Sequence, residues 1–386
     1  MTGRNFGWDP TQFQQAIAHI ASIIRQDDGS SQLAKDRSNG LSYGKLFLGS
    51  DSAITPDLLI PAADRIDVSK ATDQQILDLV AKCISTYMGD LLFSQDKFGR
   101  FIGSPYDVFL RINHLPVQPK AGESVAQYNQ ELTQAVAGLG NPVFVDGSYG
   151  SFQYHSQPFA FGPTELAGLK IFLKVANNAV DGSQHAGNCV SCHQPPTFTD
   201  ANFHNTGVAQ DEYDGVHAPG AFAALSVPSL AVRSQNYDAY LPQTPSHPNA
   251  TERFRRAADA GNPDFADLGL WNIYLNPDRP NPQDKLKSLV CGPGKDCSVD
   301  QGLGNTVGQF KTPTLRDLED SAPYFHNGSK LKFDDVVNFY INTSQLARQG
   351  NLRNAPPEFK NMSLSPADLD ALVAFLKSLT EDYDDA

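Results

Sequence analysis

The sequence predicts an all-α protein with long connections between its helices. Apolar side chains recur at three- and four-residue intervals in six segments, and several of these segments start with residues typical of helix N-termini. The alternation of apolar and polar residues that marks strands is scarce. With 386 residues, of which 40% are hydrophobic, the chain is long enough for two domains, each with its own core.

Three of the helices are predicted in the N-terminal half, each with an apolar stripe: residues 10–25, 73–88 and 123–137. The first starts with Asp9 as a cap and Pro10 at the first helical position. The second follows a capping box of Thr72 and Gln75. Cys83 shares the apolar face of the second helix, so we expect it to be an unreactive core cysteine.

Three further helices are predicted in the C-terminal half: residues 164–176, 333–342 and 366–379, the last capped by Ser365. Residues 138–163 are rich in Gly, Pro and aromatics and predict a linker between a domain at 1–137 and a second at 164–386. Residues 209–308 have little periodicity and are longer than a compact domain usually tolerates in one loop. We expect short helices there, covering a functional face.

The charge and hydropathy of the chain exclude some classes of partner. A formal net charge of −13 argues against binding of nucleic acid or of an anionic membrane surface. The same charge favours a basic electron-transfer partner by long-range steering. No run approaches the roughly 18 apolar residues of a membrane span, so none is expected.

The most specific motif is C-x-x-C-H, formed by Cys189, Cys192 and His193. In this motif two thiols bind the vinyl groups of a haem covalently and the histidine ligates its iron. A zinc site would need two more ligands at compatible spacing, and a redox dithiol would need a βαβ pattern. Neither is visible, so we favour haem c over both alternatives.

Two further cysteines, Cys291 and Cys297, flank a Gly-Pro-Gly turn that lets the chain ends meet. We favour a disulfide between them over two free thiols. Haem c is normally attached after export, which indicates a periplasmic or otherwise exported protein. Residues 1–8 contain no apolar signal segment, so we expect that a leader has been removed or that the start is missing.

The sequence around the motif resembles the second haem domain of the dihaem cytochrome c peroxidase and MauG family. Four segments carry the resemblance, in the family's order and approximate spacing: Cys189 to Gly207, Asp267-Leu268-Gly269, Phe310 to Arg316, and Ala322 to Gly328. The resemblance implies a cytochrome c-like haem domain and electron transfer through a covalent haem, for hydrogen peroxide reduction or peroxide-driven oxidation. It also implies an electron donor such as a small cytochrome or cupredoxin, and it is compatible with a homodimer.

The resemblance also implies a distal haem ligand. Twelve residues after the glycine that corresponds to Gly328, peroxidases carry an iron-ligating methionine and MauG-type proteins carry a tyrosine; here the residue is Tyr340. A phenolate is a harder donor than a thioether and favours ferric iron. The alternative is that Tyr340 is a core residue, because it continues a helical stripe with Phe333 and Val337.

Other residues of the matched segments have less specific roles. Arg316 can pair with a haem propionate, or it forms an ordinary salt bridge. His204 and His326 can hydrogen-bond backbone around the haem crevice. The family resemblance places calcium-binding carbonyls at Ser321 and Pro323, but the asparagine that completes that site falls before residue 1.

The N-terminal part resembles a truncated first haem domain of the family. Trp8 would be the tryptophan between the two haems, an electron relay, or else a core or capping aromatic. The family's first C-x-x-C-H, which binds the peroxidatic haem with an open iron site, lies upstream of that tryptophan and is absent here. Two functions remain: a peroxidase-type oxidoreductase, or a mono-haem electron-transfer cytochrome without peroxidase activity.

Overall fold

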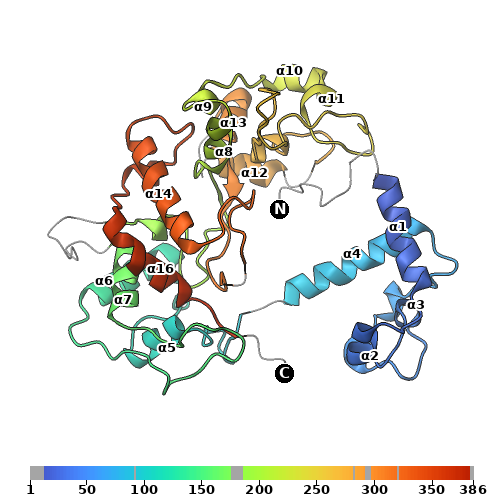
Figure 1. Ribbon diagram of the computed structural model, residues 1–386, viewed down its shortest axis with the longest axis horizontal. Helices are drawn as coiled ribbons and strands as arrows, with labels where there is room; N and C mark the ends of the chain where they lie inside the picture. The colour runs from blue at the N-terminus through green and yellow to red at the C-terminus, as the bar shows by residue number, and fades with distance from the viewer. Residues whose placement is uncertain are drawn as a thin grey trace. The chain divides into compact units, whose positions relative to one another are not determined.

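The computed structural model describes residues 13–90, 93–174, 186–280, 283–291, 297–319 and 321–382. The chain forms two compact units, which divide between Leu92 and Phe93. Both are mainly helical, which confirms the all-α class (Figure 1). The one sheet among the described residues pairs β1 (Phe203–His204) with β2 (Phe310–Lys311), antiparallel.

The described residues of the N-terminal unit form four α-helices and two 3-10 turns. These elements are α1 (Phe13–Gln26), α2 (Gln32–Ser38), α3 (Tyr43–Leu48), η2 (Pro56–Leu58), η3 (Ala62–Asp64) and α4 (Asp73–Asp90). Helix α1 packs against both α3 and the long helix α4. The small core of the unit contains Ala21, Ile24, Phe47, Ile76 and Leu79. The predicted helices at 10–25 and 73–88 correspond to α1 and α4; Trp8, Asp9 and Pro10 lie outside the described residues.

The capping box at the start of α4 is confirmed: Thr72 Oγ1 accepts from Gln75 N at 3.2 Å and Gln75 Oε1 accepts from Thr72 N at 2.8 Å. The expectation for Cys83 is wrong, because this residue is exposed. Periodicity extends the apolar stripe of α4 to Cys83, but the core that covers the helix ends near Leu79.

The larger unit is built on the crossing of two helices that are distant in sequence. Its principal elements are α5 (Pro105–Ile112), α6 (Val125–Ala137), α7 (Pro163–Phe172), α14 (Phe333–Arg348), α15 (Pro357–Lys360), η6 (Pro366–Asp368) and α16 (Leu369–Lys377). Helices α7 and α16 lie side by side (Figure 1). They meet at Gly168, where a Cβ atom would lie 1.9 Å from the carbonyl oxygen of Ala371. The glycine therefore permits the close approach of the two backbones.

The boundary between the units differs from the predicted linker at 138–163. Helices α5 and α6 share one core with α7 and α16, so residues 93–137 belong to the larger unit. Within the predicted linker, Val145 and Phe161 exchange two backbone hydrogen bonds of 3.0 Å, and both side chains are buried. The aromatic side chains of this segment complete the core of the larger unit. The sequence does not show this, because the segment has no hydrophobic periodicity.

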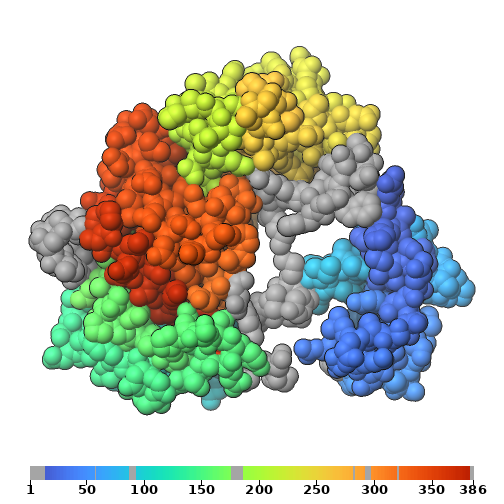
Figure 2. Space-filling view, viewed as in Figure 1, coloured from blue at the N-terminus to red at the C-terminus, as the bar shows by residue number. Residues whose placement is uncertain are grey.

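Residues 209–308 contain short helices, as expected, but they also have a hydrophobic core of their own. The elements are α8 (Val208–Val216), α9 (Ala221–Ala224), α10 (Leu230–Gln235), α11 (Tyr237–Tyr240), η5 (Leu270–Asn272), α12 (Gln283–Cys291) and α13 (Val299–Asn305). Trp271 and Phe254 are fully buried at its centre. Figure 2 shows this region gathered in yellow-green to light orange.

The disulfide between Cys291 and Cys297 is confirmed, with Cα atoms 5.6 Å apart. It joins the end of α12 to the segment that precedes α13. No helix in the described ranges has the length and apolar character needed to cross a membrane.

Candidate haem-attachment site

The C-x-x-C-H motif forms a tight turn that is held by its own neighbours. Cys189–Ser191 is a 3-10 turn (η4), and the backbone N–H of His193 donates to the Cys189 carbonyl at 2.9 Å. Asn188 precedes the turn in a left-handed conformation with φ of 52°. Its side chain accepts from Ser191 Oγ at 2.9 Å and donates to the carbonyl of Glu358 on α15 at 3.1 Å. The motif is therefore fixed to the α15 region.

A second set of contacts fixes the start of the turn. Ala186 and Ser363 exchange backbone hydrogen bonds of 3.1 and 2.8 Å, and Gly187 N–H donates to the carbonyl of Ile171 on α7 at 2.9 Å. A Cβ atom on Gly187 would lie 2.8 Å from that carbonyl oxygen and 3.0 Å from the Cys189 sulfur. Glycine is thus needed for the chain to pass between α7 and the first cysteine.

The ring of His193 interacts with two backbone carbonyls, those of Phe198 and Pro313. Its Nδ1 lies 3.0 Å from the carbonyl oxygen of Phe198, which leaves Nε2 as the nitrogen that would ligate iron. Phe198 is itself immobilised: its side chain is fully buried and packs against Tyr106, Phe172 and Phe375. Burial lowers the pKa of His193, which favours the neutral imidazole that a metal needs.

The two cysteines of the motif are not joined to each other or to any described residue by a disulfide. Burial raises the pKa of Cys189 to about 12, so its thiol stays protonated and unreactive toward oxidants at neutral pH. A Cys-rich zinc site would need further cysteines as ligands. Cys291 and Cys297 are bonded to each other, and Cys83 is an exposed residue of the N-terminal unit.

Tyr340 lies on α14 near both cysteines of the motif. Burial raises the pKa of its phenol, and the thiols of Cys189 and Cys192 raise it further, against a hydrogen bond with Thr206 that lowers it. Its ring also packs against Phe359, with centroids 5.9 Å apart. Tyr340 therefore contacts the core, as the helical stripe predicts, and its phenol is also within electrostatic range of the two thiols of the attachment turn.

Arg316 occupies a buried ion pair. Its terminal nitrogens donate to the two carboxylate oxygens of Asp107 at 3.0 and 2.9 Å, and its Nε donates to the carbonyl of Pro196 at 2.9 Å. Both charged side chains are at most 3% exposed. Of the two predicted roles, the structure contains a salt bridge, and this salt bridge is in the core rather than at the surface. Because Pro196 precedes Phe198 in the same loop, Arg316 also supports the segment that orients His193.

The other predicted residues either make contacts of their own or lie outside the described residues. Ser321 and Pro323 are exposed, and the hydroxyl of Ser321 donates to the Asp317 carbonyl. His326 stacks on Phe310 with ring centroids 3.5 Å apart. Trp8 lies outside the described residues.

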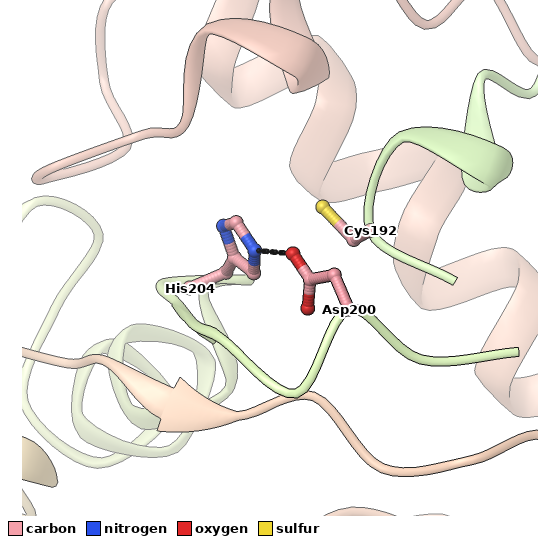
Figure 3. A group of neighbouring side chains, drawn as sticks. All are labelled: Cys192, Asp200 and His204. Atoms are coloured by element: carbon pink, nitrogen blue, oxygen red, sulfur yellow. Dashed lines mark hydrogen bonds and ion pairs between the residues drawn. The ribbon is translucent and has the colours of Figure 1, made fainter. Parts of the chain in front are cut away.

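One group beside the motif was missed by the sequence reasoning. Asp200 Oδ2 lies 2.8 Å from His204 Nε2, and one donor atom from each of Cys192, Asp200 and His204 lies within 4.8 Å of the others (Figure 3). Burial disfavours the charged imidazole, but hydrogen bonds to Asp200 and Cys192 outweigh it and raise the pKa of His204 to about 10. The sequence contains one sign of this group: an Asp and a His four residues apart, shortly after the motif.

Comparison with known proteins adds an independent observation. The chain is 28% identical over 230 residues to cytochrome-c peroxidase IdrP2 from Denitromonas iodatirespirans, a match that covers 56% of this chain and 45% of the relative. It is 26% identical over 212 residues to cytochrome-c peroxidase IdrP1 from Pseudomonas sp. (strain SCT), covering 53% and 41%. The chain is thus similar to cytochrome-c peroxidases. The match spans less than half the length of each relative. No protein-family profile matches the chain.

Proposed function

We propose that this protein holds a haem c on Cys189 and Cys192, with His193 as the proximal iron ligand, and acts as a peroxidase-type oxidoreductase. The observation that carries the proposal is the geometry of the turn. Its two thiols are free, and the Nδ1 of the adjacent histidine is engaged by the Phe198 carbonyl. The similarity to proteins named cytochrome-c peroxidases supports the reaction class.

The residues present fit a covalent haem. The bound group would supply one-electron oxidation and reduction at iron. The chain's own part is to fix the two sulfur atoms on one turn and to orient the histidine ring from its far side. A carbonyl that accepts from Nδ1 makes Nε2 a stronger donor, which stabilises the higher oxidation state.

Tyr340 is the distal ligand in this proposal, and the protein is closer to MauG-type proteins than to methionine-ligated peroxidases. Support comes from its position on α14, close enough to the thiols of Cys189 and Cys192 for them to raise the pKa of its phenol. If the Tyr340 oxygen ligated iron, the phenol would lose its proton and the iron would take the proton's place on the oxygen. The hydroxyl of Thr206, which interacts with the same phenol, would then hold its orientation.

The electron donor is a basic redox protein, such as a small cytochrome or a cupredoxin, and the reaction takes place in the periplasm or another exported location. The formal net charge of −13 supports a basic partner. The oxidising equivalents come from hydrogen peroxide, which is either reduced or used to oxidise a second substrate.

Haem stoichiometry tests the attachment site directly. We expect a pyridine haemochrome assay on the exported full chain to give one haem per chain, and the C189S/C192S variant to give none. The matched control is C83S, which removes an exposed thiol of the N-terminal unit and should keep the full haem content. An exported wild-type chain without haem would refute the proposal.

Two further measurements separate the finer parts of the proposal. Tyr340→Phe should change the ferric optical and EPR spectra while haem content stays constant; unchanged spectra would reject Tyr340 as a ligand. Turnover of hydrogen peroxide with a reduced donor should be measurable. A haem-loaded chain that exchanges electrons with the donor but consumes no peroxide would instead be a simple electron carrier.

A further inference from the structure

We propose that the haem-free chain binds a single divalent zinc-type cation through Cys192, Asp200 and His204, and that metal binding and haem attachment exclude each other. The metal site itself does not depend on the proposed function; only the competition rests on it. The donor set is one thiolate, one imidazole and one carboxylate, which is typical of borderline-soft cations such as Zn²⁺.

The local structure brings these three donors together and keeps them together. Asp200 follows Cys192 in a closed loop, because its backbone N–H donates to the Cys192 carbonyl at 2.8 Å. One oxygen of the Asp200 carboxylate accepts from Asn202 N–H at 2.9 Å, and the other lies 2.8 Å from His204 Nε2. His204 is on β1, whose pairing with β2 fixes its backbone. Figure 3 shows the sulfur, the carboxylate and the ring converging.

The distances and exposure suit a metal ion with an open position. The three donor atoms lie within 4.8 Å of one another. Donors at about 2.0–2.3 Å from a tetrahedral ion lie roughly 3.5 Å apart, so small side-chain rotations close the site. The side chains of His204 and Asp200 are 18% and 14% exposed, which admits an ion and leaves room for a water as the fourth ligand.

The electrostatics of the cluster favour a cation at its centre. The two groups that face His204, the Asp200 carboxylate and the Cys192 thiol, are both anionic when deprotonated. A divalent ion bound between the three donors would pair with both anions. His193 is also within electrostatic range of His204, and its Nδ1 lies 3.0 Å from the Phe198 carbonyl oxygen.

Competition with haem follows from the chemistry of the sulfur atom. Attachment adds the Cys192 S–H across a haem vinyl group: sulfur bonds to one vinyl carbon, the proton goes to the other, and no electrons are gained or lost. The resulting thioether is neutral and a weak ligand for zinc. A Cys192 thiolate bound to a metal, in turn, is not available to the vinyl group.

Cobalt(II) titration of the full chain, produced without haem attachment, tests the site. We expect one equivalent of Co²⁺ to produce a thiolate-to-cobalt charge-transfer band, and Zn²⁺ to displace it. C192S should abolish the band, and D200N and H204A should each weaken binding roughly tenfold or more. The matched control is C189S, which removes the other thiol of the same turn and should keep the band. The C83S background excludes binding at the exposed thiol.

Three outcomes would overturn the proposal: no band in the wild-type chain, a band that persists in C192S, or equal loss in C189S and C192S. Circular dichroism of each variant shows whether a lost band reflects lost folding. The haem-loaded protein should bind no Co²⁺ at this site, and excess Zn²⁺ should slow haem attachment to C189S, which keeps only Cys192. If haem attaches but the haem-free chain binds no metal, the metal site is refuted and the proposed function stands.

Discussion

Glu381, near the C-terminus, should make the stability of the larger unit depend on pH. Its side chain is 2% exposed. Oε1 accepts from Ser94 N–H at 2.7 Å, while Oε2 is buried without a hydrogen-bond partner among the described residues. Burial is the main cause that raises its pKa from 4.5 to about 7; Asp317 and Asp107 add to the rise, and the Ser94 N–H and Arg316 oppose it.

The size and sign of the effect follow from this pKa. Below pH 4.5 the carboxyl is protonated in both the folded and the unfolded chain. Between pH 4.5 and about 7 the unfolded chain releases a proton that the folded chain keeps, so the free energy of unfolding falls as pH rises. At ~1.4 kcal/mol per pH unit the loss reaches ~3 kcal/mol.

Glu381→Gln removes this loss because the amide cannot ionise. We expect the variant to gain ~3 kcal/mol in unfolding free energy relative to wild type on going from pH 4.5 to pH 8. Urea unfolding followed by circular dichroism at a series of pH values measures it. Asp370→Asn, a neutralised exposed carboxyl on α16, is the control and should show no such change. If the unfolding free energies of wild type and E381Q differ by the same amount at pH 4.5 and at pH 8, the reasoning is refuted.

Three other groups of substitutions test the packing of the larger unit by thermal unfolding. Gly168→Ala should cost ~3 kcal/mol or more, because the added methyl group meets the Ala371 backbone; Gly215→Ala on α8, where the space is open, should stabilise by ~0.5–1 kcal/mol. Arg316→Met should cost ~3–5 kcal/mol by leaving Asp107 buried and unpaired, and a second change of Asp107→Leu should recover part of it. Replacing both Cys291 and Cys297 by Ser should cost ~2 kcal/mol, since their separation of six residues closes only a short loop; no loss would mean that the disulfide does not constrain the unfolded chain.

Sequence patterns predicted the helices whose signals are local. The Thr72 capping box and the Ser365 cap were both found where expected, because each is formed by residues three or fewer positions apart. The helix predicted at 333–342 continues to Arg348. The prediction ended too early because polar residues in the last turns interrupt the hydrophobic periodicity. Helix α5 was missed: it has eight residues, too few for a periodic pattern, although Ser104 and Asp107 form a capping box at its start.

The candidate site was predicted in part for the same reason. A motif of five consecutive residues makes Cys189, Cys192 and His193 recognisable without any knowledge of the fold. The partner of Arg316 was not predictable, because Asp107 is 209 positions away. The same holds for the Cys192, Asp200 and His204 cluster, whose members come together only when the loop closes on the Cys192 carbonyl.

By itself, the sequence determined the helical class, the Cys291–Cys297 pairing and the C-x-x-C-H turn, since each depends on contacts between residues close along the chain. The tertiary structure alone decided where the compact units divide and which carbonyl orients His193. It also decided that Cys83 is exposed and that Arg316 is paired with Asp107 in the core. The physical reason is burial: which side chains lose contact with water depends on how distant segments pack, and hydrophobic periodicity gives the direction of a face but not the partner that covers it.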